Sequence, residues 1–230
     1  MNHANVGRGI LRYGWWSRVN HWIVALCFVL LALSGLALFH PVFFGFTGLF
    51  GGPIPTRIVH PFIGVLMVVF FAIQAVRFFG DNRIRRHDIQ WLRQIRDVLS
   101  NRDERLPPVG KNNAGQKLVY WIFLFSVPVL LLSGLVIWRP YFADDMPRQL
   151  LRWAAMIHAY AAFVAILTLI IHVYSAIWVK GSIRAMTRGR VSRAWARHHH
   201  SLWYEEVVRG ERPDEDIREP LPERPPRNRP

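Results

Sequence analysis

Apolar residues are gathered into four long segments rather than dispersed along the chain. The segments cover approximately residues 20–39, 58–79, 118–138 and 153–179. A helix of about 20 apolar residues crosses the roughly 30 Å hydrocarbon layer of a bilayer. The pattern predicts an all-α membrane protein in which four transmembrane helices form a bundle. We expect the first segment to be retained, because Ser34-Gly35-Leu36-Ala37 is a weak cleavage site within a continuous apolar run.

The charged residues predict an orientation for these helices. The chain has 29 Lys and Arg against 15 Asp and Glu, a formal net charge of +14. Lys and Arg concentrate in the amino-terminal arm, between the second and third segments and in the carboxyl-terminal tail, whereas 40–56 contains neither and 139–152 balances its arginines with Asp144 and Asp145. Basic loops stay in the cytoplasm, so both termini are expected on the cytoplasmic side of the membrane. Such segregation argues against a nucleic-acid-binding protein.

Two further regions complete the predicted organisation. Between the second and third segments, apolar residues recur at helical spacing among arginines: Ile84, Trp91, Leu92, Ile95, Val98 and Leu99. This pattern is typical of an interfacial helix on the cytoplasmic surface, where its basic face would bind anionic lipid. Residues 1–208 are predicted to form one membrane domain. Residues 209–230 are rich in Pro, Arg and Glu and are predicted to be a disordered tail.

Four histidines fall at two depths of the predicted bundle. His158 and His172 are fourteen residues apart on the fourth segment, which places them about 21 Å apart on nearly the same helix face. His60 begins the second segment and His21 the first. With the amino terminus inside, His60 matches the depth of His158 near the outer face, and His21 matches His172 near the inner face.

Depth-matched pairs of imidazoles suggest two haems stacked across the membrane. A low-spin haem b needs one nitrogen ligand on each side of its iron, and facing helices can supply both. Cys27 is the only cysteine, which excludes a Cys-x-x-Cys-His attachment, so the haems would be non-covalent. Two alternatives are interfacial or hydrogen-bonding histidines, and a haem-free anchor or transporter that relays protons through them.

Several separated motifs resemble one known family. They are Asn20-His21-Trp22, Arg57-Ile58-Val59-His60-Pro61-Phe62, Gly110-Lys111-Asn112-Asn113-Ala114-Gly115-Gln116-Lys117, Ile137-Trp138-Arg139-Pro140-Tyr141-Phe142 and Trp178-Val179-Lys180-Gly181-Ser182-Ile183. Together they resemble the cytochrome b, or gamma, subunit of membrane-bound respiratory formate dehydrogenase, over residues 12–206. The resemblance implies two haems b, with His60 and His158 as the outer axial ligands and His21 and His172 as the inner ones.

The resemblance also implies partners and an electron route. In this family a catalytic alpha subunit with molybdenum or tungsten oxidises formate, and an iron–sulfur beta subunit delivers the electrons on the periplasmic side. The electrons then pass through the outer and inner haems to menaquinone or ubiquinone near the cytoplasmic face. The chain would therefore be a non-catalytic electron-transfer subunit, since its sequence contains no molybdenum site or nicotinamide motif.

The segment before the third apolar run is a candidate quinone site. Asn113 and Gln116 offer the hydrogen bonds that a quinone carbonyl needs, and Gly115 allows close approach of a ring. On residues alone, a helix start with Asn112 or Asn113 as cap is an equal reading. The resemblance favours quinone binding by Asn113, Gly115 and Gln116. Asn112 stands where the family has a bulkier residue, so the quinone type is left open.

One alternative keeps the electron transfer and changes the donor. A nickel–iron hydrogenase or another quinone-linked dehydrogenase uses a related dihaem cytochrome b, although the Gly110–Lys117 motif favours formate dehydrogenase. An aromatic and cationic belt on the predicted outer side would anchor the helices or dock the iron–sulfur subunit; its members are Trp138, Arg139, Tyr141, Phe142 and Trp153.

Overall fold

The computed structural model describes residues 9–100, 106–139 and 141–212. They fall into two compact units. The first, called the bundle, consists of residues 16–84 and 115–179. The second unit combines three stretches that are distant in sequence, and its described parts are 9–15, 85–100, 106–114 and 180–212. Most of the predicted tail, residues 213–230, lies outside the described residues.

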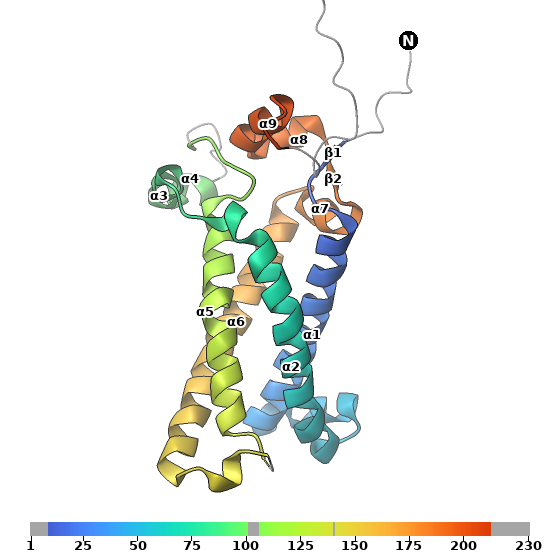
Figure 1. Ribbon diagram of the computed structural model, residues 1–230, viewed down its shortest axis with the longest axis vertical. Helices are drawn as coiled ribbons and strands as arrows, with labels where there is room; N and C mark the ends of the chain where they lie inside the picture. Colours follow the sequence, from blue (N-terminus) through green and yellow to red (C-terminus); the bar gives the residue numbers. More distant parts are fainter. Residues whose placement is uncertain (1–8, 101–105, 140, 213–230) are drawn as a thin grey trace, which may run out of the picture. The chain divides into compact units, whose positions relative to one another are not determined.

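Four long helices make up the bundle and run beside one another (Figure 1). They are α1 (Trp15–Phe39), α2 (Pro53–Phe78), α5 (Ala114–Val136) and α6 (Arg148–Trp178). Each is long and apolar enough to cross a membrane. Many outward side chains are large and apolar, including Val76, Phe125 and Phe163. Exposing such a surface to water would cost free energy, whereas lipid chains solvate it. The prediction of a four-helix membrane bundle is therefore confirmed.

Each helix begins four or five residues before the apolar run that predicted it. Proline explains two of these early starts, because its fixed φ suits the first turn and its missing N–H is not needed there. Pro53 is the first residue of α2, and Pro147 precedes α6. Short 3₁₀ helices make the connections within the bundle: η2 (Pro41–Phe50), η3 (Gly80–Asn82) and η5 (Ala143–Asp145).

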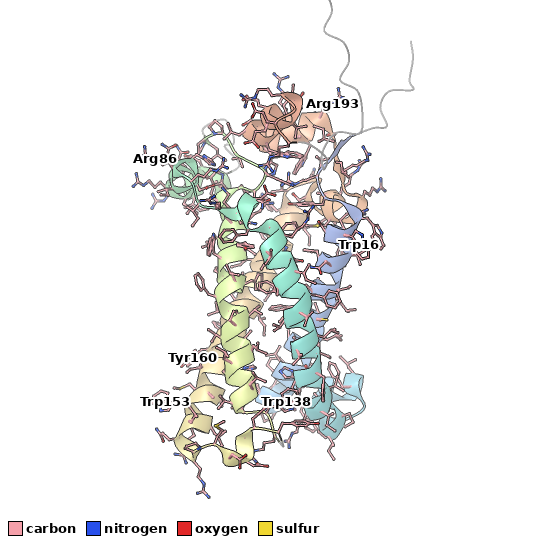
Figure 2. All side chains as sticks on the ribbon, viewed as in Figure 1. Trp16, Arg86, Trp138, Trp153, Tyr160 and Arg193 are labelled. Carbon is pink, nitrogen blue, oxygen red and sulfur yellow. The ribbon has the colours of Figure 1, made fainter. Side chains whose placement is uncertain are left out.

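Contacts at the two ends show that consecutive bundle helices are antiparallel. At one end, Asn20 Nδ2 near the start of α1 donates to the Phe70 carbonyl near the end of α2 at 3.0 Å. At the same end, Tyr120 on α5 donates its hydroxyl to the Ala75 carbonyl at 2.8 Å. At the other end, the rings of Phe62 and Trp138 pack edge to face with centroids 5.2 Å apart. Figure 2 shows Trp16 at the first end and Trp138 and Trp153 at the second, as expected for interfacial aromatics.

The second unit is held together by chain segments from both termini. Strand β1 (Ile10–Leu11) pairs antiparallel with β2 (Arg190–Val191). Its helices are α3 (Arg86–Arg93), α4 (Ile95–Leu99), α7 (Ser182–Arg188), α8 (Arg193–His199) and α9 (Ser201–Val208). A small apolar core forms around Ile10, Val191 and Trp203. Gly9 is required beside β2, since a Cβ there would lie 2.3 Å from the Val191 carbonyl oxygen.

Arg12 is buried at the centre of this unit. Its guanidinium lies 5.1 Å from the ring centroids of both Trp195 and Trp203, and its Nη2 donates to the Lys111 carbonyl. Two indole faces and a carbonyl therefore compensate the desolvated charge. The amino-terminal arm, the segment before α5 and the tail all meet at this side chain.

His200 makes a second link between the tail and the segment before α5. Its ring is buried, and its Nδ1 lies 2.8 Å from the Gly110 carbonyl oxygen, to which it donates. Burial, reinforced by the Arg12 guanidinium, lowers the pKa of His200 well below its usual range. The last member of the His198–His200 run is therefore a neutral core residue of the second unit.

Replacing Arg12 tests the role of this buried cation. Arg12→Met keeps an unbranched side chain but removes the charge, and we expect a loss of about 2 kcal/mol in local stability, the scale of a desolvated cation–π contact. Amide hydrogen exchange in α9 should then be about 30-fold faster. Arg188→Met, on an exposed arginine of α7, is the matched control. Equal exchange rates in the two variants would contradict the assignment.

Candidate functional site

The bundle brings four histidines together as two pairs. His60 of α2 faces His158 of α6, and His21 of α1 faces His172 of α6. The ring centroids are 6.4 Å apart in each pair. Helix α6 is continuous between its two histidines, so its rise of 1.5 Å per residue separates the pairs by about 21 Å. These are the two pairs that depth matching predicted.

In the His60/His158 pair, a serine hydroxyl contacts Nδ1 of each ring. Ser34 Oγ of α1 lies 2.7 Å from His60 Nδ1, and Ser133 Oγ of α5 lies 3.0 Å from His158 Nδ1. Each hydroxyl donates its own proton to a carbonyl one helical turn earlier. The hydroxyl therefore accepts a hydrogen bond from Nδ1–H, and the lone pair of each imidazole is on Nε2.

A glycine follows each of these serines and allows the imidazole to approach the helix backbone. A Cβ on Gly35 would lie 3.3 Å from Cε1 of His60, and a Cβ on Gly134 would lie 3.3 Å from Cε1 of His158. Both distances are tighter than ordinary van der Waals contact, so any larger residue would displace the ring. The serine and glycine thus act together, one bonding the ring and the other making room for it.

Sequence reasoning missed both serine–glycine steps. The sequence alone indicated no role for Ser34 and Gly35 beyond a weak cleavage site, and it indicated none for Ser133 and Gly134. A signal was available, because the tetrapeptide Leu-Ser-Gly-Leu occurs at 33–36 and again at 132–135. Each copy lies on the helix that precedes a histidine-bearing helix.

The His21/His172 pair is held differently. His21 Nδ1 is buried and has no hydrogen-bond partner among the described residues. The ring packs edge to face on Trp22, with centroids 5.6 Å apart. A buried ring nitrogen without a partner costs free energy, so the ring of His21 is less completely satisfied by the protein than the rings of His60 and His158.

The spacing within each pair fits two axial ligands of one metal ion. Bonds from a metal to imidazole nitrogen are about 2.0 Å long, and a ring nitrogen lies about 1.1 Å from its centroid, so coaxial ligands have centroids about 6.2 Å apart. The observed 6.4 Å agrees for both pairs. Within the described residues, no group of three or more His, Cys, Asp or Glu side chains could hold a metal ion. Two imidazoles alone therefore suit a metal whose other ligands come from a macrocycle, as in haem.

The candidate quinone residues lie at the beginning of α5. Asn113 immediately precedes this helix, and Gly115 and Gln116 belong to its first turn. All three are half-buried, and the preceding Lys111 and Asn112 are buried. The structure therefore agrees with the helix-start reading of this segment.

The aromatic residues at the opposite end of the bundle form a contiguous group. Trp138 contacts Phe62, Tyr141 and Phe142, with ring centroids 5.2, 5.2 and 6.0 Å away. His40, which has no depth-matched partner, is exposed at the end of α1 and accepts a hydrogen bond from the Val42 amide through Nδ1. It takes no part in either histidine pair.

A four-helix membrane bundle with histidine pairs at two depths defines the class of membrane cytochromes of the b type. Comparison with known proteins supports the same class. The model of the family described as prokaryotic cytochrome b561 matches residues 12–189.

Individual relatives show to which group within this family the chain belongs. The chain is 44% identical over 202 residues to the cytochrome b556(Fdn) subunit of the nitrate-inducible formate dehydrogenase of Escherichia coli K12, covering 88% of this chain and 93% of that protein. It is 44% identical over 198 residues to the cytochrome b556(fdo) subunit of formate dehydrogenase from the same strain, covering 86% and 93%. It is 35% identical over 199 residues to the formate dehydrogenase cytochrome b556 subunit of Haemophilus influenzae, covering 86% and 84%. The chain belongs to the prokaryotic cytochrome b561 family and, within it, to the formate dehydrogenase cytochrome b subunits.

Proposed function

We propose that this chain carries electrons across the bacterial inner membrane for a formate dehydrogenase, using two non-covalent haems b. His60 and His158 would be the axial ligands of one haem, and His21 and His172 those of the other. The observation that carries the proposal is the pair of 6.4 Å ring separations, one at each depth of α6. Bound haem supplies one-electron storage at each of these depths.

The histidines determine what kind of haem chemistry the site permits. His60 with His158, and His21 with His172, would each hold one haem through two imidazoles, and a haem held in this way would supply one-electron transfer rather than binding of oxygen or another small ligand. Burial of the rings among apolar helices excludes water from the bonds to the metal. Both features suit electron transfer rather than catalysis at the metal, in keeping with a non-catalytic subunit.

The distribution of basic residues supports a direction for this transfer. At the end of the bundle that contains His21 and His172, the chain continues into basic segments before α1, between α2 and α5, and after α6. The connections at the end that contains His60 and His158 carry little net charge. The positive-inside rule then places both termini in the cytoplasm and the His60/His158 pair near the periplasm. Electrons would enter at that pair and leave from the His21/His172 pair.

The partners follow from this direction. The relatives are named as subunits of formate dehydrogenase. We propose that a periplasmic iron–sulfur subunit delivers electrons from a catalytic subunit containing molybdenum or tungsten, docking near the aromatic group around Trp138. Aromatic residues of this kind are enriched at the buried centres of interfaces.

Menaquinone or ubiquinone is the proposed electron acceptor, bound by Asn113, Gly115 and Gln116. The half-buried amides can hydrogen-bond to both the quinone carbonyl and the quinol hydroxyl, since each amide has donors and an acceptor. The residues lie at the cytoplasmic end of α5 in the proposed orientation. Protons taken up there, with formate oxidised outside, would contribute to the proton-motive force.

The connection between α2 and α5 is a candidate for contact with anionic lipid. Three apolar residues spaced one turn apart, Ile89, Leu92 and Ile95, are exposed, while Trp91 is buried. A lipid surface would cover such a row, and the neighbouring arginines would meet lipid phosphates. We propose that α3 and α4 lie on the inner leaflet.

Substituting the histidines one at a time tests the ligand assignment. His60→Ala and His158→Ala should each remove the same haem, because one missing axial nitrogen opens the site. His21→Ala and His172→Ala should each remove the other haem. The measurements are pyridine-haemochrome quantification, falling from two haems per chain to one, and low-spin electron paramagnetic resonance, losing one of two signals.

His40→Ala is the matched control, since His40 is an exposed histidine outside both pairs, and it should keep both haems. Retention of both haems in any of the four paired-histidine variants would overturn the assignment.

The quinone site is tested by removing its hydrogen bonds without changing side-chain size. Asn113→Leu and Gln116→Leu should leave haem content and haem reduction by formate intact. Reoxidation by quinone should slow by about tenfold or more, the value of one buried hydrogen bond to a polar ligand. Stopped-flow spectroscopy at the haem absorbance gives both rates. Gln149→Leu, an exposed glutamine in the first turn of α6, makes the same change at the opposite end of the bundle; if it slows reoxidation equally, the proposed site is wrong.

A further inference from the structure

Two different helices carry the same serine–glycine step beside the same pair of histidines. Ser34 and Gly35 of α1 contact His60, and Ser133 and Gly134 of α5 contact His158. The two sites share the hydroxyl contact to Nδ1 and the closeness of Cε1 to the glycine, where an added Cβ would lie 3.3 Å from Cε1 in each case. A coincidence of packing would not reproduce both features on both sides of one pair.

The hydrogen bonds of each hydroxyl determine where the imidazole proton is. Ser34 Oγ lies 2.7 Å from the Leu30 carbonyl, and Ser133 Oγ lies 2.6 Å from the Val129 carbonyl. A carbonyl only accepts, and a hydroxyl has one proton, so this proton is committed to the helix backbone. Toward the histidine the hydroxyl can therefore only accept, which requires Nδ1–H on both rings.

The opposite pair lacks this support at His21, whose buried Nδ1 has no partner among the described residues. An imidazole that donates from Nδ1 is a more basic ligand at Nε2 than one that does not. A more basic ligand stabilises the oxidised, more positive metal relative to the reduced one. The two sites therefore differ in a way that affects their reduction potentials.

We propose that Ser34 and Ser133 are positioning residues that hold His60 and His158 with Nε2 directed at the haem iron and lower the reduction potential of that haem. The proposal rests on the proposed ligation by these histidines. Because electrons would enter at this pair, a lower potential here makes the onward step to the His21/His172 haem more favourable. The serines thus contribute to the direction of electron flow.

The experiment is a potentiometric titration of the purified complex, followed by low-spin electron paramagnetic resonance. In Ser34→Ala, one of the two midpoint potentials should become more positive by up to about 59 mV. For a one-electron couple this shift corresponds to a change of about tenfold in the equilibrium between oxidised and reduced haem. The potential of the other haem should not move. Ser133→Ala should shift the potential of the same haem in the same direction, because its hydroxyl makes the equivalent contact with Nδ1 of His158.

Two further variants separate hydroxyl chemistry from packing. Ser34→Thr keeps the hydroxyl and should retain the wild-type potential and resonance signal. Ser175→Ala removes a hydroxyl that donates to the carbonyl of Ile171, one turn earlier on α6, and that bonds no histidine in the described part of the chain; it should change neither potential. If Ser34→Ala loses the haem altogether, retention of that haem by Ser34→Thr still supports the proposal.

Unchanged potentials and resonance signals in both alanine variants would overturn the proposal, as would loss of the haem in Ser34→Ala and Ser34→Thr alike. Failure of the proposed function looks different: the unsubstituted chain would lack two haems, or His60→Ala would keep both. A chain that passes those histidine tests but shows no effect of the serines would refute only the role of the serines.

Discussion

A ring nitrogen buried in hydrocarbon without a partner costs free energy, and this cost shapes the packing around His60 and His158. Water cannot satisfy a ring nitrogen within the membrane-spanning helices, so the protein and its ligand must do so. At His60 and His158, helices α1 and α5 supply the serine hydroxyls that bond Nδ1, which leaves Nε2 for a metal. The antiparallel arrangement of α1, α2, α5 and α6 brings histidines of different helices to equal depth, so that they face each other in pairs.

Hydrophobic length and histidine spacing were enough to predict the four helices and the two pairs. A span has to be about 20 apolar residues long whatever its neighbours are, and a helix rises by a constant amount per residue, so depth can be calculated from residue number. The serine–glycine steps could not be obtained in this way. A serine in a membrane helix commonly bonds its own backbone, and only the packing of α1 on α2 reveals that Ser34 also contacts His60.

The second unit shows a different limit of sequence reasoning. The basic residues after the fourth apolar segment predict only which side of the membrane they face, yet Trp195 and Trp203 flank the buried Arg12, and His200 bonds the Gly110 carbonyl. Tertiary contacts between segments at least 90 residues apart produce this unit, and local sequence periodicity does not predict such contacts. Its consequence for function is that the segment leading into α5, which contains Asn113, is attached to the tail by the Leu202 amide and the His200 ring. The segment that leads to Asn113 of the proposed quinone site is therefore held by tertiary hydrogen bonds at Val109 and Gly110.

The central claim is that each histidine pair holds one haem b, and haem quantification of the unsubstituted chain tests it most directly. The measurement is a reduced-minus-oxidised spectrum with pyridine-haemochrome quantification on the purified complex, using formate as the only reductant. The account predicts two b-type haems per chain, both reduced by formate and reoxidised by quinone. One haem per chain, or none, would contradict it.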